Sequence, residues 1–395
     1  MSLPGAPSVR GAVGWTLAQH GAFFASAWLV SWWAGAGRFG EWSQALALAT
    51  VLAALITLRM EYAGQLDARA ARAASLFAAA RRLALGLGLG VAALGMGAAL
   101  AGAVPWWAGA GALAVAPLAL VQVGAAAHAR EGRVAAAAAV RALPALCMVP
   151  LQAAACALQA PDAIAWSLPV AAWASLCVMR APRHGAPRLR RLLRARRPFL
   201  RAEWLGLALN TAANHGQVLA VGLVAGDAAA GVIALGMRVA MLPTSLVGLA
   251  WADGLRAQFV ASGARGEAQA VVKAALRRMA GASLPMHLAG AMAAWWLLPW
   301  LFPAQGRELA TVVLFLLPLG AVRMVASPVA FLPAWRGWLG LSLLGQCLLF
   351  TAAFGAALAG ERWGAEGVAT AYAAAAICVY MGYIVCALRA VRADT

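Results

Sequence analysis

The stretch TLRMEYAGQLD, residues 57–67, closes a long apolar segment and places Arg59 and Glu61 two positions apart. Side chains two positions apart on a helix point in different directions, so these two residues need not pair with each other. An arginine here fits a helix that ends at the cytoplasmic face of a membrane. The glutamate does not follow from that rule, and we expect it to have an electrostatic partner on another helix.

The composition around this stretch is that of a polytopic membrane protein. Of the 395 residues, 64% are hydrophobic and 11% are charged, whereas soluble domains are about 45–50% apolar and about 25% charged. The net charge of +18 does not indicate nucleic-acid binding, because the basic residues lie in short loops between apolar segments. We expect anionic membrane lipids or an anionic lipid substrate as the electrostatic partners, and no nucleic acid.

Segments of about 20 apolar residues can cross a bilayer, and their number predicts an all-α fold of twelve transmembrane helices. The segments are 12–34, 40–58, 83–104, 107–128, 134–158, 162–180, 203–224, 231–251, 283–302, 308–327, 338–358 and 365–388. A basic linker at 181–202 separates residues 1–180 from residues 203–395, which predicts two six-helix bundles with the substrate path between them. Gly40 and Gly231 open similar stretches at equivalent places in the two halves.

The arginines give the orientation. They follow the even-numbered helices, whereas the opposite loops hold only Arg38, Arg307 and Arg362. Basic loops stay in the cytoplasm, so both termini are expected there. The polar segments 59–82 and 252–282 alternate alanine, leucine and arginine, which predicts amphipathic helices lying on the membrane.

The sequence lacks the common patterns of catalysis. It contains no GxxxxGK[ST], HExxH or GxSxG pattern, and its six cysteines lie in apolar segments without a CxxC pair. We therefore expect no catalytic residues, no metal site and no disulfide framework. A transporter is favoured over an enzyme.

Polar residues inside the predicted helices mark a candidate substrate cavity, because polar groups at membrane depth are costly. The candidates are Gln19 and His20 in the first helix, Asn210, Asn214 and His215 in the seventh, Arg238 in the eighth and Arg323 in the tenth.

Four of these candidates also have a plainer explanation. An arginine can bind a phosphate through two hydrogen bonds, but Arg238 would also be explained by snorkelling or an interhelical ion pair. Arg323 lies near enough to the cytoplasmic end to be a positive-inside residue. Asn210 and Asn214 share a helix face, where interhelical hydrogen bonds and cavity lining both remain open.

Residues 38–67 resemble the polysaccharide (oligosaccharide) flippases of the multidrug/oligosaccharidyl-lipid/polysaccharide exporter superfamily. Members carry a Phe-Gly motif before the second helix and an LRYELA-like motif at its end, which correspond here to Phe39-Gly40 and residues 58–63. In the second half, residues 229–248 resemble the family's pattern of spaced Gly, Arg and Pro.

The resemblance implies a flippase of the bacterial inner membrane with two six-helix bundles around a central cavity. Its substrate would be a polyprenyl-pyrophosphate-linked oligosaccharide for surface polysaccharide synthesis, with polysaccharide polymerase machinery as a partner. Coupling would be to an H⁺ or Na⁺ gradient without another cofactor, and Arg59 and Glu61 would belong to a gating motif. An exporter of drugs or another lipid, and a membrane enzyme or assembly partner, stay open. The lack of a clear mid-span carboxylate favours an anionic substrate.

Overall fold

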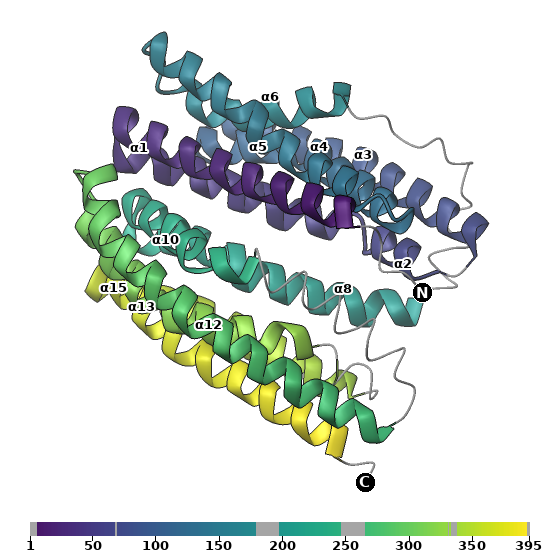
Figure 1. Ribbon diagram of the computed structural model, residues 1–395. Helices are drawn as coiled ribbons and strands as arrows, with labels where there is room; N and C mark the ends of the chain where they lie inside the picture. The colour runs from purple at the N-terminus through teal and green to yellow at the C-terminus, as the bar shows by residue number, and fades with distance from the viewer. Residues whose placement is uncertain are drawn as a thin grey trace. The chain divides into compact units, whose positions relative to one another are not determined.

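The computed structural model describes residues 6–67, 69–178, 197–245, 265–330, 332 and 338–392. Within these residues every regular element is a helix and no strand occurs, which confirms the all-α prediction (Figure 1). By contacts the chain forms two compact units, residues 1–219 and 220–395. The boundary falls inside the predicted seventh helix. The division by repeat into 1–180, 181–202 and 203–395 stays a prediction.

The first unit contains the helices that precede this boundary. They are α1 (Ala6–Ile56), α2 (Met60–Leu66), α3 (Ala70–Leu100), α4 (Trp106–Arg130), α5 (Val134–Ala157), α6 (Ala163–Val178), α8 (Arg197–Thr211), the π-helix η1 (Ala212–Gly216) and the start of α9 (Gln217–Ala225). α8 and η1 group with this unit because both pack against α1.

The second unit begins at Ala220, within α9. Its further helices are α10 (Asp227–Ala240), α12 (Arg265–Leu301), α13 (Gly306–Ala326), the short 3₁₀ helix η3 (Ser327–Val329) and α15 (Leu339–Arg392). α12, α13 and α15 lie side by side in Figure 1, and α10 packs against α13.

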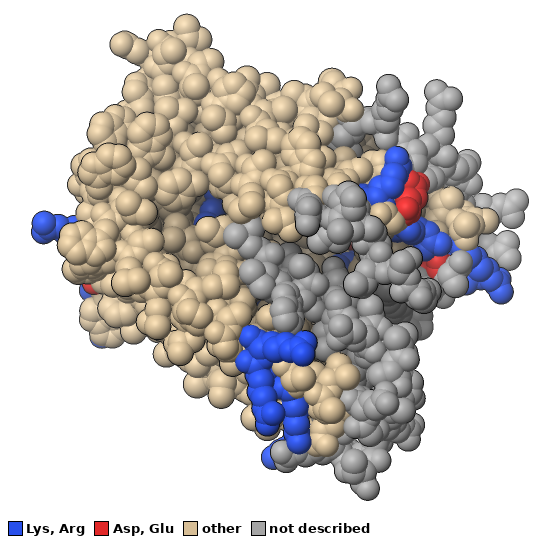
Figure 2. Space-filling model, viewed as in Figure 1, with Lys and Arg blue, Asp and Glu red and all other residues tan. Residues whose placement is uncertain are grey.

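Each of the twelve predicted helices corresponds to a described helix, although residues 179–180 of the sixth and 246–251 of the eighth lie outside the described residues. α1 comprises two of them, joined at Gly35, and α15 comprises two more, joined at Gly364. α8, η1 and α9 together form the seventh. Among the described residues, seven helical segments are long and apolar enough to cross a membrane. Uncharged side chains cover most of the described surface seen in Figure 2, as expected of a chain in lipid.

The predicted surface helices at 59–82 and 252–282 are wrong for residues 70–82 and 265–282, which belong to longer helices. Residues 70–82 form the first turns of α3, and residues 265–282 form the first turns of α12, while 252–264 lie outside the described residues. The apolar positions pack against neighbouring helices instead of lipid. Phe77 of α3 is buried with Val123 of α4, and Val272 of α12 is buried with Ala387 of α15.

Glycines join consecutive helices without an intervening loop. Gly35 has φ 82° and ψ 172°, and Gly226, between α9 and α10, has φ 87° and ψ 169°. This region of backbone conformation is open essentially only to glycine. Gly35 precedes Gly40 by the same interval as Gly226 precedes Gly231. The equal spacing and the matching conformations support the predicted internal repeat.

Small residues allow helices of the first unit to pack closely, as interhelical contacts in membranes require. A Cβ added to Gly88 of α3 would lie 2.7 Å from Cα of Ala116 in α4. A Cβ added to Gly111 of α4 would lie 2.8 Å from the carbonyl oxygen of Ala45 in α1. α4 is therefore held backbone to backbone against two neighbours.

The joint at Gly35 can be tested by substitution. Nothing lies within 4 Å of a Cβ at this position, so Gly35→Ala acts only through backbone strain, and we expect it to cost about 1–3 kcal/mol of stability. Gly37→Ala is the matched control, because Gly37 also faces open space without a positive φ. Thermal unfolding in detergent should show a lower Tm for Gly35→Ala and an equal or higher Tm for Gly37→Ala. An equal effect of the two substitutions would contradict this account.

Candidate functional site

Residues 57–67, which contain Arg59 and Glu61, build a tight corner between α1 and α3. After Ile56, Leu58 and Arg59 adopt left-handed φ values of 51° and 60°. Such conformations cost residues other than glycine about 1–3 kcal/mol each, so other contacts must hold this turn. Met60 and Ala63 supply part of them, because both are buried in an apolar cluster formed by α2, α3 and α4.

Hydrogen bonds to α4 and α3 fasten the same corner. Arg130, in the last turn of α4, donates from Nη1 to the carbonyl oxygens of Gly64 and Gln65, at 2.9 and 3.2 Å. Gln65 Nε2 donates in return to a carbonyl of α4 at 3.3 Å. The buried Asp67 accepts the backbone N–H of Arg69 at 3.1 Å, immediately before α3. The motif is thus anchored on both sides.

Arg59 and Glu61 occupy this corner in different ways. The Arg59 guanidinium lies 4.4 Å from the ring centroid of Tyr62, a cation–π contact. Burial raises the pKa of the Glu61 carboxyl above its usual value, while Thr57 and Arg59 act in the opposite direction. Among the described residues Glu61 forms no ion pair, so the expected partner on another helix is not found there.

The predicted polar residues of the seventh helix lie at a local change of helix type. η1 contains Asn214 and His215, and π-helical turns frequently occur at functional sites. Asn214 Nδ2 donates to the backbone oxygen of Asn210 at 2.7 Å and to its Oδ1 at 3.1 Å. This confirms that the two asparagines share a face. His215 is exposed.

Gln19 and His20 lie in the first half of α1, and both are partly exposed. α1 packs against both α8 and η1, and Trp204 Nε1 of α8 donates to the Leu55 carbonyl, in the half of α1 that follows Gly35. Gln19 and His20 lie in the other half, so their proximity to the asparagines stays a prediction. The first unit contains most of the predicted polar candidates.

Arg238 and Arg323 both lie in the second unit. Arg238 is in the last turn of α10 and Arg323 in the last turn of α13. Cations are favoured at helix C-termini by the helix dipole. Arg238 lies nearer to a helix end than the predicted helix 231–251 suggests, whereas Arg323 was already expected near the end of the predicted helix 308–327. Nη1 of Arg238 is fully buried. A shared cavity between the two halves stays a prediction.

Arg323 is part of an aromatic cluster that sequence reasoning missed. Its guanidinium lies 5.9 Å from the ring centroid of Tyr380 on α15, and Tyr380 packs against Tyr383 at 6.3 Å between centroids. Gln346 Nε2 donates to the Tyr383 hydroxyl at 3.2 Å, and this hydroxyl donates to the Ser342 carbonyl at 3.1 Å. The sequence does carry a signal for this cluster, because Tyr380 and Tyr383 are three positions apart and therefore share a helix face.

A second polar cluster, which we did not predict from the sequence, surrounds His287 on α12. The His287 side chain is buried, with 6% of the residue exposed. Its Nδ1 lies 2.7 Å from the Ser283 carbonyl oxygen, and its Nε2 bonds to no described residue. Ser283 Oγ donates to the Ala321 carbonyl and Thr244 Oγ1 to the Gly320 carbonyl, each at 3.0 Å. Ser283 and His287 are four residues apart on one face of α12, a spacing that the sequence does show. The contacts with Ala321 and Gly320 are long-range, and no local pattern indicates them.

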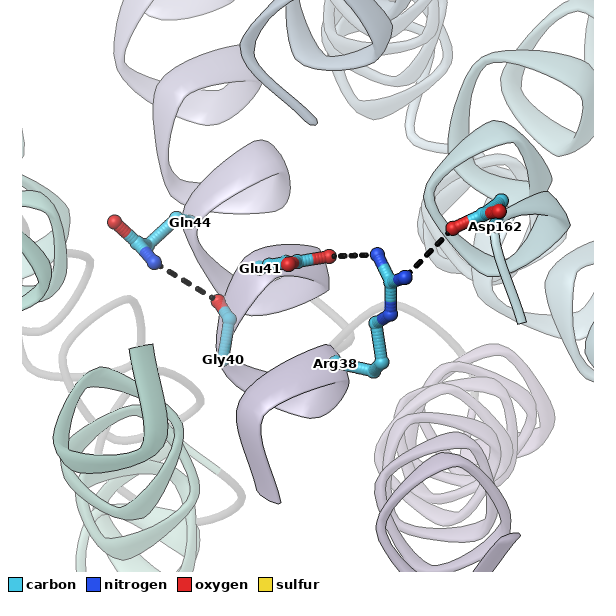
Figure 3. A network of polar contacts seen from close by, with 5 residues as sticks. All are labelled: Arg38, Gly40, Glu41, Gln44 and Asp162. Atoms are coloured by element: carbon cyan, nitrogen blue, oxygen red, sulfur yellow. Dashed lines mark hydrogen bonds and ion pairs between the residues drawn. The ribbon is translucent and has the colours of Figure 1, made fainter. Parts of the chain in front are cut away.

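The first unit also contains a pocket of about 350 Å³ at the end opposite the α2 corner. Arg38 Nη1 donates to Glu41 Oε2 at 2.9 Å, and its Nη2 pairs with Asp162 Oδ1 at 2.7 Å (Figure 3). Arg38 thereby ties α1 to the turn before α6. The remaining wall is apolar and comprises Trp106, Trp107, Pro161, Ile164, Ala165 and Trp166, so half of these residues are tryptophans.

Comparison with known proteins shows the fold. No protein-family model matches the sequence, and no curated protein matches it. An inward-closed structure of the lipid II flippase MurJ is 9% identical, with a TM-score of 0.67, covering 98% of this chain and 88% of that chain. An outward-facing multidrug resistance MATE family transporter of the MOP superfamily is 14% identical, with a TM-score of 0.62, covering 98% and 97%. An inward-facing MATE structure is 16% identical, with a TM-score of 0.56, covering 100% and 96%. The chain shares the twelve-helix fold of these membrane transporters.

The raised pKa of Glu61 predicts a pH-dependent stability. The folded state keeps this proton at pH values where the unfolded chain has lost it, so stability falls as the pH rises above about 4 and through the raised pKa. Glu61→Gln removes this loss. We expect a higher Tm than wild type at pH 8 and an equal Tm near pH 4.

The exposed Arg277 provides the control for this measurement, because an arginine keeps its charge from pH 4 to pH 8. Arg277→Ala should leave the pH profile of the Tm unchanged. A Glu61→Gln profile that runs parallel to wild type from pH 4 to pH 8 would refute the account of the buried carboxyl.

Proposed function

We propose that this chain is a flippase that moves a polyprenyl-pyrophosphate-linked oligosaccharide across the bacterial inner membrane by alternating access. The arginine-bearing helix ends and both termini face the cytoplasm in this proposal. An H⁺ or Na⁺ gradient drives the transport, and the product enters surface polysaccharide synthesis. The fold shared with MurJ and with MATE transporters supports a transporter as the class of protein.

The observation that carries the proposal is the placement of the acidic residues. Each acidic side chain that the structure describes lies within two turns of a helix end or of a glycine joint. These residues are Glu41, Glu61, Asp67, Glu131, Asp162, Asp227, Glu308 and Glu366. An exporter of cations would need carboxylates at membrane depth to balance its substrate. The described residues instead favour an anionic substrate.

The intramembrane arginines fit the same substrate. A pyrophosphate offers several acceptor oxygens, and a guanidinium can bind them through paired hydrogen bonds. The buried Nη1 of Arg238 points to an environment of low dielectric, where such a bond gains strength. The polar groups at Asn210, Asn214 and His215 are proposed to contact the sugars.

Transport itself is the first test. The purified chain is reconstituted in vesicles with a polyprenyl-pyrophosphate oligosaccharide, and an impermeant lectin reports the oligosaccharide that reaches the outer leaflet. We expect protein-dependent translocation. Export of organic cations without movement of the lipid-linked oligosaccharide would overturn the proposal in favour of a drug exporter.

Arg238→Ala should weaken binding of the pyrophosphate head group. A lost charge-assisted hydrogen bond costs about 1.5–3 kcal/mol, which corresponds to a roughly 10- to 100-fold rise in Kd for a soluble polyprenyl-pyrophosphate analogue. Arg277→Ala is the control, because Arg277 is exposed on α12. Equal Kd values for the two variants would make Arg238 a structural residue.

Arg59 and Glu61 are proposed to act in gating, because they lie at the strained turn that links α1 to α2. Glu61→Gln should slow transport several-fold although the fold is at least as stable as wild type at neutral pH. Transport in vesicles and Tm on the same preparation separate the two effects. Unchanged transport by the Glu61→Gln variant would show that the motif contributes to packing and not to gating.

A further inference from the structure

We propose that the pocket around Arg38 in the first unit binds a neutral pyranose ring of the transported oligosaccharide. The proposal rests on the flippase function above and adds a second subsite to it, at the end of the unit opposite the α2 corner. The pocket volume of about 350 Å³ falls in the range of small-molecule sites, which begins at about 300 Å³.

The aromatic walls fit one part of such a ring. A pyranose has an apolar face of C–H groups, and an indole provides a broad apolar surface with a polar N–H at one edge. Trp106 and Trp166 lie with ring centroids 6.4 Å apart and planes inclined by 49°, so they form two adjoining walls. They come from different helices, α4 and α6, and Trp107 adds a third indole. Trp106 is 54% exposed, which leaves its ring accessible to a ligand.

The charged network fits the hydroxyl groups of the ring. Arg38 engages one oxygen of Glu41 and one oxygen of Asp162 (Figure 3). The second oxygen of each carboxylate forms no hydrogen bond with a described residue. Two acceptors therefore remain for hydroxyl donors, and the Asp162 side chain is 82% exposed toward an incoming ligand.

The charge of the pocket selects the kind of sugar. One guanidinium and two carboxylates leave a net charge of about −1 at neutral pH. A uronic acid or the pyrophosphate would be repelled, whereas a neutral ring is accepted. The protein would thus bind the lipid-linked head group at two sites. The sugar would bind in this pocket, and the pyrophosphate would bind at a separate basic site.

A belt of interfacial tryptophans is the plain explanation of aromatic residues at this depth. The geometry argues against this explanation alone, because the indoles border one concave pocket together with an ion-pair network. An anchoring tryptophan needs only a lipid-facing surface. Trp296 of α12, which is 76% exposed, is such a residue and serves as the matched control.

The test measures binding, separately from transport. The full-length chain in nanodiscs is titrated with maltose, with N,N′-diacetylchitobiose and with glucuronic acid, and saturation-transfer NMR reports the sugar protons in contact with protein. We expect transfer from at least one neutral disaccharide and none from glucuronic acid. Trp166→Ala should raise the Kd about tenfold, as expected for the loss of one stacking wall, and Trp296→Ala should leave it unchanged.

A second variant guards against misfolding. Asp162→Asn keeps the shape of the side chain and removes its charge, so it should preserve the Tm within a few degrees and admit glucuronic acid. Equal binding by the Trp166→Ala and Trp296→Ala variants, binding of neither neutral sugar, or preference for tetraphenylphosphonium over sugars would overturn the pocket proposal. Vesicle transport without sugar binding would overturn the pocket alone. Sugar binding without transport would overturn the flippase and retain the pocket.

Discussion

The architecture depends on one constraint: a bilayer core offers no water to unpaired backbone groups, so a crossing segment must pair its own N–H and C=O groups. All regular elements in the described parts of both units are helical for this reason. The same constraint favours short connections. At Gly35, Gly226 and Gly364 a single residue redirects the chain between helices. Such joints leave few backbone groups without partners near the membrane surface.

Within the first unit the charged groups separate to the two ends. The α2 corner, with Arg130 bonded to backbone carbonyls, lies at the arginine-rich end. The opposite end carries the Arg38 network, where carboxylates outnumber guanidinium groups. The lipid-linked oligosaccharide proposed above would therefore meet basic groups at one end of this unit and acceptor oxygens at the other.

Hydropathy predicted the fold class and the helix number because lipid imposes an apolar composition over a fixed length. The beginnings of α3 and α12 were not predictable in this way. Arginines between residues 69 and 82 are typical of a cytoplasmic segment, and only the tertiary packing of Phe77 shows that a helix continues through it. The Asn210–Asn214 pair followed from helical periodicity, whereas the π-helix around it did not.

Long-range contacts account for the rest of the difference between sequence and structure. Arg130 reaches Gly64 across 66 positions of the chain, and no local pattern encodes this bond. A buried carboxylate can be neutralised by a nearby cation, and for this reason Glu61 was expected to have a partner on another helix. The raised pKa of Glu61 offers another route, in which the proton itself neutralises the group.

The joint at Gly35 has a mechanical consequence. The second half of α1 is a continuous helix beyond this residue, so two torsion angles at one glycine set the direction of the whole rod. Arg38 lies within the first turn after the joint and is tied to Asp162. A small rotation at Gly35 moves the far end of the rod, near Arg59, much farther than it moves Arg38. The ion pair therefore lies close to the point of rotation, whereas the α2 corner lies at the end of the helix that moves most.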